Sequence, residues 1–225
     1  VDQFPLPRIN ELLSVTKGMK WFSSIELTSA YHQIPLHPNS KHLTAFITPF
    51  GCFQFKRVPF GLASAAAMFQ RLMHQLFHEV ENVIFFQDDI LVMGKEKEDH
   101  KNKVNLVLRI LQEVGLTAEK TKCKFEQNKI TYLGNEISEK GMSPKPELVE
   151  AITKAKTPQN KDDVRSFLGL AEYYAKFIKN FSEKIYPIRQ LLKKNVKFSW
   201  SEECQLSFDS VKKNICTAPA LKGFD

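Results

Sequence analysis

The chain has 225 residues, 43% of them hydrophobic and 25% charged, which excludes a disordered or fibrous protein and allows one or two globular domains. Its apolar runs, such as Val83–Phe86, are too short to span a bilayer. The net charge of +7 arises in residues 91–225, because residues 1–90 hold 7 basic and 7 acidic side chains; this favours either a polyanionic partner or a solvated lysine-rich surface.

The first part of the sequence predicts short strands mixed with helices. Short apolar runs between turn residues indicate the strands, and a 3.6-residue apolar period indicates the helices. Gly115 is expected to end the longest helix, because glycine readily adopts the left-handed conformation of a C-terminal cap. In chain order the expected elements are helix 8–15, strand 21–27, a hairpin over 43–58, helix 64–79, strands 83–86 and 90–93, helix 97–114, and short strands near 124–125, 130–133 and 136–138.

Past Gly141 the apolar period indicates helices only, over residues 162–178, 182–193 and 201–216. The segment over 139–146 reads Glu-Lys-Gly-Met-Ser-Pro-Lys-Pro, which is the composition of a linker. We therefore expect an α+β domain followed by a small helical domain.

The cysteines and histidines give little support for a metal site. No cysteine pair has CxxC spacing, so we expect four free thiols in a reducing compartment. His74 and His78 share a helix face, but no third ligand lies near them in the sequence. His100 stands near the start of a helix and is expected to be exposed.

Two adjacent carboxylates, Asp88 and Asp89, lie between the two apolar strands predicted over 83–93. Neighbouring charges in such a place are unfavourable unless something pairs with them. Mg²⁺ prefers oxygen ligands and is often held by one or two carboxylates together with substrate phosphates. A metal site is one explanation of this pair, and a solvated turn is the other.

Glu26 supplies a third carboxylate at the end of the strand predicted over 21–27. If this strand lies beside the 83–93 hairpin, Glu26 faces Asp88 and Asp89. Three carboxylates then suit two metal ions ~3.5–4 Å apart, the arrangement used for phosphoryl and nucleotidyl transfer. A surface acid at a strand end is the alternative for Glu26 alone.

Six segments, in the same order as in a known family, carry a resemblance that covers nearly the whole chain. They read PLPRINELL at 5–13, FSSIELTSAYHQIPL at 22–36, TAFITPFGCFQFKRVPFGLASAAAMFQRLM at 44–73, FFQDDILV at 85–92, CKFEQNKITYLGNEIS at 123–138 and VRSFLGLAEYYAKFIKNFS at 164–182. On these segments the chain resembles the reverse transcriptases of gypsy-type long-terminal-repeat retrotransposons and related retroviruses.

The resemblance implies an α+β fold, that of a right-hand polymerase. Residues 1–140 would form the palm with part of the fingers, an antiparallel sheet backed by helices. Residues 141–197 would form a small helical thumb, and residues 198–225 the start of a connection toward an RNase H domain. The implied function is RNA-directed DNA polymerase, within a retrotransposon pol polyprotein that also carries RNase H and DNA integration functions.

The resemblance also assigns roles to residues of the α+β part. Glu26, Asp88 and Asp89 match the catalytic acids, which together with the backbone carbonyl of Leu27 would hold Mg²⁺ or Mn²⁺. Tyr31 matches the aromatic residue that excludes a 2′-hydroxyl. The full set of positions implied to bind the nucleotide is Tyr31, Phe60, Gly61, Gln70 and Phe86.

Further positions match regions that bind the template and primer. Tyr132, Leu133 and Gly134 match the hairpin that grips the primer end. Basic residues of the helical part suit contacts to a nucleic-acid backbone, which any template offers; they are Lys161, Lys176, Lys179 and Lys184. The implied partners are an RNA or DNA template with its primer and deoxynucleoside triphosphates, with no membrane and with a homodimer formed through the parent polyprotein. The implied location is intracellular, either cytoplasmic in a retroelement particle or nuclear.

Three positions depart from the family pattern, which normally has Asp at Glu26, Tyr at Phe86 and Pro near Ala66. The extra methylene of Glu26 displaces its carboxylate, and a misplacement of ~1 Å can lower a rate ~100-fold. We also expect this chain to be a piece that lacks the upstream fingers segment. Weak or no polymerase activity is therefore expected from it alone. The alternative is a decayed or domesticated module that binds nucleic acid or protein, and the order of motifs argues against a metal-dependent nuclease.

Overall fold

The computed structural model describes residues 4–216. The chain divides into two compact units, the first reaching Tyr132 and the second beginning at Leu133. Among the described residues, no helix combines the length and the apolar character needed to cross a membrane.

A four-stranded sheet in the order β4-β5-β1-β6 forms the centre of the first unit. β1 (Trp21–Glu26) is antiparallel to β5 (Asp89–Gly94) on one side and to β6 (Lys124–Gln127) on the other. β4 (Val83–Phe86) pairs antiparallel with β5, and β7 (Lys129–Tyr132) contacts β1. The strand and the hairpin predicted from the sequence are therefore direct neighbours.

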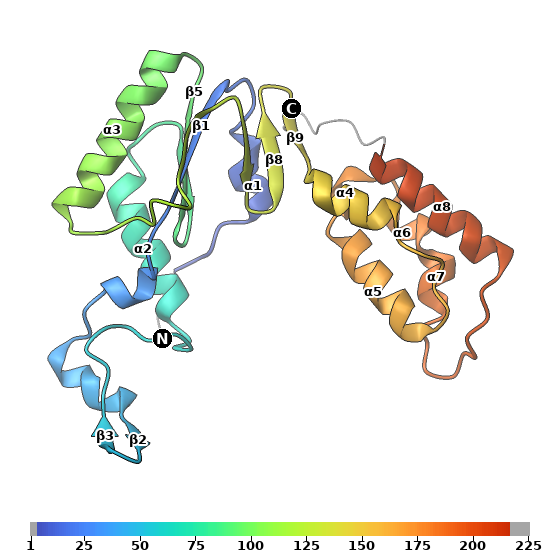
Figure 1. Cartoon of the computed structure of the whole chain (residues 1–225), viewed down its shortest axis with the longest axis horizontal. Coiled ribbons are helices and arrows are strands. Elements are labelled where there is room, and N and C mark those ends of the chain that lie inside the picture. Colours follow the sequence, from blue (N-terminus) through green and yellow to red (C-terminus); the bar gives the residue numbers. More distant parts are fainter. Residues whose placement is uncertain (1–3, 217–225) are drawn as a thin grey trace. The chain divides into compact units, whose positions relative to one another are not determined.

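Two helices pack against this sheet, α2 (Ala65–Phe77) against β4 and α3 (Lys97–Glu113) mainly against β5 (Figure 1). Phe69, Met73 and Phe77 of α2 are buried, because a spacing of four residues places them on one face of the helix. They join the inward side chains of the strands in one apolar core. The helices predicted over 64–79 and 97–114 are confirmed, as is the apolar face of the first. The shorter α1 (Ile9–Ser14) contacts β4, and the 3₁₀ helix η1 (Ala30–Gln33) contacts α2.

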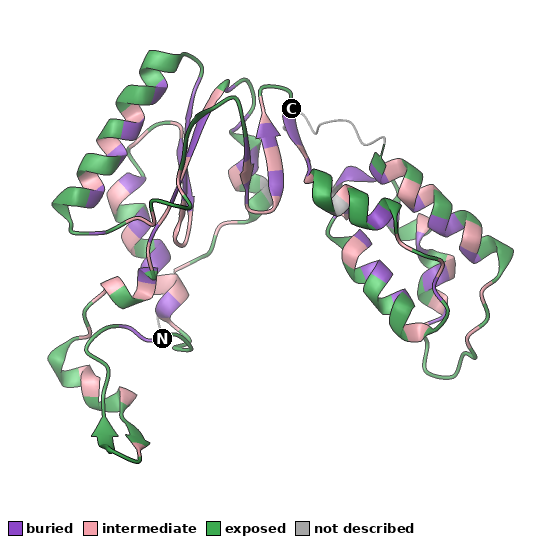
Figure 2. Cartoon of the chain, in the orientation of Figure 1, coloured by how far each residue is buried: buried purple, intermediate pink, exposed green. Residues whose placement is uncertain are grey.

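Residues 38–57 form an arm that extends away from the sheet (Figure 1). The arm contains the 3₁₀ helix η2 (Pro38–Thr44) and a two-stranded sheet of β2 (Phe46–Thr48) and β3 (Gly51–Phe53). The hairpin predicted there is confirmed, but its strands are shorter than expected because its first residues belong to η2. Figure 2 shows most of the arm in the colour of exposed residues, and Phe50 at its turn is 91% exposed.

The second unit begins with an antiparallel hairpin of β8 (Asn135–Ser138) and β9 (Gly141–Pro144). Strand β9 lies where the sequence predicted a linker and helices only. It forms because Gly141 adopts a φ of 110°, which lets the chain turn and pair Met142 with Ile137. The composition of this segment therefore concealed a short strand.

The remainder of the second unit is helical. Asn160 caps one helix, because its side-chain oxygen accepts the N–H groups of Asp162 and Asp163. The helix predicted over 182–193 is split into two, and Pro187 stands in the first turn of the second piece, where its missing N–H is tolerated. In chain order the helices are α4 (Pro146–Thr153), α5 (Lys161–Glu172), η3 (Ala175–Phe177), α6 (Phe181–Lys184), α7 (Tyr186–Gln190) and α8 (Glu202–Cys216).

Candidate active site

Three acidic residues are backbone neighbours where β1 ends and β5 begins. Glu26, the last residue of β1, is the register partner of Asp89, the first residue of β5. The backbone N–H of Leu27 donates a hydrogen bond of 2.9 Å to the carbonyl oxygen of Asp88. Phe86 pairs with Asp89 across the turn between β4 and β5. The antiparallel register of β1 and β5 is thus the reason why acids about sixty positions apart in the sequence become neighbours.

The acids influence one another electrostatically. The pKa of Asp89 is raised from 3.8 to about 6, first because burial removes water from its carboxylate and then because Asp88 and Glu26 are negatively charged neighbours. Lys122 opposes this shift through its positive charge. Negative charge is in excess here, and an excess of this kind is what a bound divalent cation stabilises.

Lys122 binds the carboxylate of Glu26, with 2.5 Å between Nζ and Oε1. The ion pair raises the pKa of Lys122, chiefly through its hydrogen bond to Glu26. Within residues 4–216, no group of three or more histidine, cysteine or acidic side chains has the arrangement of a metal-binding cluster. The sequence reasoning missed Lys122, because a lysine among other lysines is typical of a solvent-exposed surface.

Two polar side chains support the backbone of the acidic turn from its buried side. Oε1 of Gln70, a residue of α2 that is only 2% exposed, accepts the N–H of Gln87 at 2.8 Å. The hydroxyl of Tyr132 donates to the carbonyl oxygen of Asp89 at 2.9 Å. Gln70 was expected to contact a nucleotide and Tyr132 a primer, whereas both are buried and bonded to the turn.

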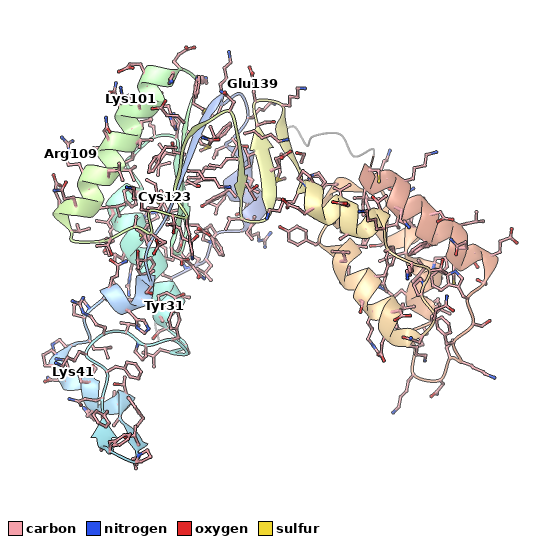
Figure 3. The ribbon with its side chains drawn as sticks, in the orientation of Figure 1. Tyr31, Lys41, Lys101, Arg109, Cys123 and Glu139 are labelled. Carbon is pink, nitrogen blue, oxygen red and sulfur yellow. The ribbon has the colours of Figure 1, made fainter. Side chains whose placement is uncertain are left out.

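An aromatic cluster lies beside the turn (Figure 3, where Tyr31 is labelled). The ring of Tyr31 lies 5.6 Å from that of Phe60 and 5.8 Å from that of Phe69. The hydroxyl of Tyr31 donates to Oε1 of Gln87 at 3.2 Å. Phe60 is 66% exposed, and Gly61 follows it at a φ of 88°, which favours glycine. Gln87 is the second residue that sequence reasoning missed, and its only signal was its place inside the acidic turn.

Leu133 and Gly134, predicted to grip a primer, begin the second unit with φ values of 45° and 73°. The carbonyl oxygen of Leu133 accepts hydrogen bonds from Nδ2 of Asn135 at 2.9 Å and from the hydroxyl of Tyr173 at 3.1 Å. A Cβ atom on Gly134 would lie 1.9 Å from that hydroxyl. Only glycine therefore fits this position while Tyr173 keeps its place.

The lysines predicted to contact nucleic acid are spread over the second unit. Nζ of Lys161 donates to the carbonyl oxygen of Lys193 at 2.9 Å, so this side chain links two segments of the unit. Lys179 is exposed and Lys184 is half-buried at the end of α6. The side chain of Lys176 lies outside the part of the chain that the structure describes.

The prediction that His100 is exposed is wrong. Its side chain is fully buried, and Nε2 lies 3.1 Å from Oγ of Ser23. The burial is possible because Gly94 has no side chain: a Cβ atom there would lie 2.6 Å from Cβ of His100. His74 and His78 stack with 5.1 Å between ring centroids, and the cysteines of the described residues are free.

Comparison with known proteins gives a family and several relatives. The model of the family described as "Reverse transcriptase (RNA-dependent DNA polymerase)" matches residues 1–137. The transposon Tf2-3 and Tf2-7 polyproteins of Schizosaccharomyces pombe are each 34% identical to the chain over 224 residues. This match covers 99% of the chain but 17% of each polyprotein, so the chain spans only a small part of the length of these relatives.

Solved structures show the same fold. The foamy viral protease-reverse transcriptase in complex with an RNA/DNA hybrid matches with a TM-score of 0.88 and 23% identity, over 99% of this chain and 31% of that one. The same viral protein in complex with double-stranded DNA matches with a TM-score of 0.87 and 23% identity, over 100% of this chain and 48% of that one. The α+β polymerase fold predicted from the sequence is confirmed.

Proposed function

The chain belongs to the family of reverse transcriptases, the RNA-dependent DNA polymerases, and from this premise we propose that it is the polymerase segment of a retrotransposon pol polyprotein. Its reaction is the extension of a primer on an RNA or DNA template with deoxynucleoside triphosphates. Residues 1–140 act as palm and part of the fingers, 141–197 as thumb, and 198–225 as the start of the connection, of which 217–225 lie outside the described residues. The observation that carries the proposal is that Glu26, Asp88 and Asp89 are neighbours at the adjoining ends of β1 and β5, where their charges influence one another.

These three carboxylates are the proposed ligands of Mg²⁺ or Mn²⁺, with the carbonyl oxygen of Leu27. The oxygen donors match the preference of these ions, and the raised pKa of Asp89 supports a site where a cation relieves repulsion between acids. When bound, the metal would activate the primer hydroxyl and stabilise the departing pyrophosphate. The buried bonds from Gln70 and Tyr132 hold the turn that presents the aspartates.

The aromatic cluster is the proposed binding site of the incoming nucleotide. The hydrogen bond to Gln87 fixes the ring of Tyr31, so that its face excludes an additional 2′-oxygen by shape. Phe60 offers an exposed ring next to it, and Gly61 and Phe86 complete the set. Gln70 serves this site indirectly in our proposal, because its side chain is bonded to the turn instead of facing solvent.

Template and primer are the proposed partners of the helical residues. A polymerase that copies any sequence must bind the nucleic-acid backbone, and the exposed Lys179 suits that contact, together with Lys161, Lys176 and Lys184. Tyr132, Leu133 and Gly134 are proposed to meet the primer end. The foamy viral proteins of the same fold bind an RNA/DNA hybrid and double-stranded DNA. A homodimer and a location in a cytoplasmic particle or in the nucleus belong to the same proposal.

Primer extension on an RNA template, with Mg²⁺ and then Mn²⁺, tests the proposed reaction. We expect slow, metal-dependent extension by the chain, because Glu26 carries one methylene more than the usual aspartate. Asp88→Asn should abolish it, while Asp99→Asn, a change of an acid in the first turn of α3, should leave it intact. Extension that survives Asp88→Asn, or a complete lack of extension and of template binding by the unchanged chain, would contradict the proposal.

A further inference from the structure

The ion pair of Glu26 and Lys122 is placed by the backbone around it. Thr28 donates its N–H to the carbonyl oxygen of Thr117 at 2.9 Å, and Glu119 donates its N–H to the carbonyl oxygen of Glu26 at 2.8 Å. The N–H of Lys122 in turn donates to the carbonyl oxygen of Glu119 at 3.0 Å. The loop over 117–122 is thereby fixed along the end of β1, and this places the backbone of Lys122 within reach of Glu26.

The length of the Glu26 side chain is what completes this contact. Its Oε1 lies 2.5 Å from the amine of Lys122 while its Cα is the register partner of Asp89. Aspartate is one methylene shorter, so its carboxylate would lie farther from the backbone of Lys122, whose position the loop fixes. Glutamate at this position therefore favours the ion pair more than aspartate would.

We propose that Lys122 is a positioning residue that competes with the divalent metal for Glu26, an inference that rests on the proposed function. The ammonium group neutralises one of three neighbouring carboxylates and turns that carboxylate toward itself. A metal ion that uses Glu26 must break the ion pair and bind beside a positive charge. The chain therefore binds its metal more weakly than the three acids alone would allow.

The charges around the pair agree with this competition. The positive charge of Lys122 attracts Asp89 as well as Glu26. The negative charges of Asp88 and Glu119 in turn attract Lys122. The side chains of Lys122 and Glu26 are 58% and 32% exposed, so water can replace each partner when the pair opens. A partly exposed pair is weak enough to exchange with a metal ion.

The test is the affinity of the whole chain for Mn²⁺ alone, measured by electron paramagnetic resonance without nucleic acid or nucleotide. Lys122→Met should tighten Mn²⁺ binding about tenfold, the effect expected for removing one positive charge a few ångströms from a divalent ion in a solvated site. Lys120→Met is the matched control, because this exposed lysine lies on the same loop; it should change the affinity less than twofold. An unchanged or weaker affinity in Lys122→Met overturns the competition.

Two further variants separate this inference from the metal site itself. Glu26→Asp keeps a carboxylate but shortens it, so it should also tighten Mn²⁺ binding, and it keeps the test valid if Lys122→Met fails to fold by circular dichroism. A weaker affinity in Glu26→Asp contradicts the inference. Asp88→Asn combined with Asp89→Asn should abolish Mn²⁺ binding. If binding persists, the proposed metal site is wrong; if it is lost while Lys122→Met changes nothing, only the competition is wrong.

Discussion

The four-stranded sheet and the arm belong to the same unit, yet they use apolar side chains in different ways. In the sheet, the side chains of Ile90 and Leu91 are completely buried. In the arm, Phe46 lies 6.1 Å from Phe53 and 5.3 Å from Phe55 between ring centroids, and all three rings remain exposed. A two-stranded hairpin of this kind has little stability of its own. The acids therefore stand on the part of the unit that has a core, and the arm contributes little to the stability of the unit.

Phe69→Ala should produce the largest loss of stability. Phe69 is fully buried on α2, next to Tyr31, and its removal leaves a cavity in the core. We expect the free energy of unfolding to fall by about 3–5 kcal/mol, measured by urea denaturation followed by circular dichroism. A loss below about 1 kcal/mol would mean that the sheet side of the unit is no better packed than the arm.

Gln70→Met should have the next largest effect. Methionine keeps the volume of the side chain but leaves the N–H of Gln87 without its acceptor. An unsatisfied, partly buried N–H costs about 1–3 kcal/mol, so the same urea experiment should show a loss in that range. Polymerase activity should fall together with stability. A neutral result would show that the acidic turn does not depend on its buried support.

Asp89→Asn should stabilise the chain at neutral and alkaline pH but not at acidic pH. The pKa of Asp89 is about 6 in the folded chain, whereas its ordinary value, which applies to the unfolded chain, is 3.8. The folded state therefore favours the protonated carboxyl. The stability that this contributes is present below pH 4 and is lost as pH rises through 6. Asparagine cannot ionise. After allowance for solvent screening, we expect a gain of about 1 kcal/mol at pH 8 and none at pH 4, from urea denaturation in the presence of EDTA. Equal stabilities at pH 8 would contradict the crowding of the acids.

Phe50→Ser should have the smallest effect. Phe50 is 91% exposed at the turn between β2 and β3. Surface substitutions of this kind usually change the free energy of unfolding by less than about 0.5 kcal/mol. The same denaturation curves measure it, beside Phe69→Ala as the buried counterpart. A loss above about 1.5 kcal/mol would show that the arm is packed against something in solution.

The elements with strong local signals were predictable from the sequence. The apolar period of α2, the strands around the acidic turn and the hairpin of the arm follow from residue pattern alone. The approach of Glu26 to the aspartates required one assumption beyond the pattern, that β1 and β5 are neighbours, and the register agrees with it. The polymerase fold and the family followed from the order of the motifs.

The missed features depend on contacts between residues far apart in the sequence. Lys122 reaches Glu26 through a loop that no periodicity describes, and Tyr132 reaches Asp89 from another strand. The burial of His100 depends on the absence of a side chain at Gly94. Strand β9 was hidden because its glycine and proline are typical of linkers. These features depend on how far a side chain extends and on how closely two segments pack. Local composition predicts neither.

The close approach of α3 to the end of β5 makes the stability of this unit sensitive to a single glycine, Gly94. Any side chain at position 94 meets the backbone and Cβ of His100, neither of which can rotate away, so Gly94→Ser should lift the first turn of α3 from the strand. Such a variant would have a lower free energy of unfolding than the unchanged chain. Because position 94 lies at the opposite end of β5 from Asp89, it would lose this stability without a direct change to the acids.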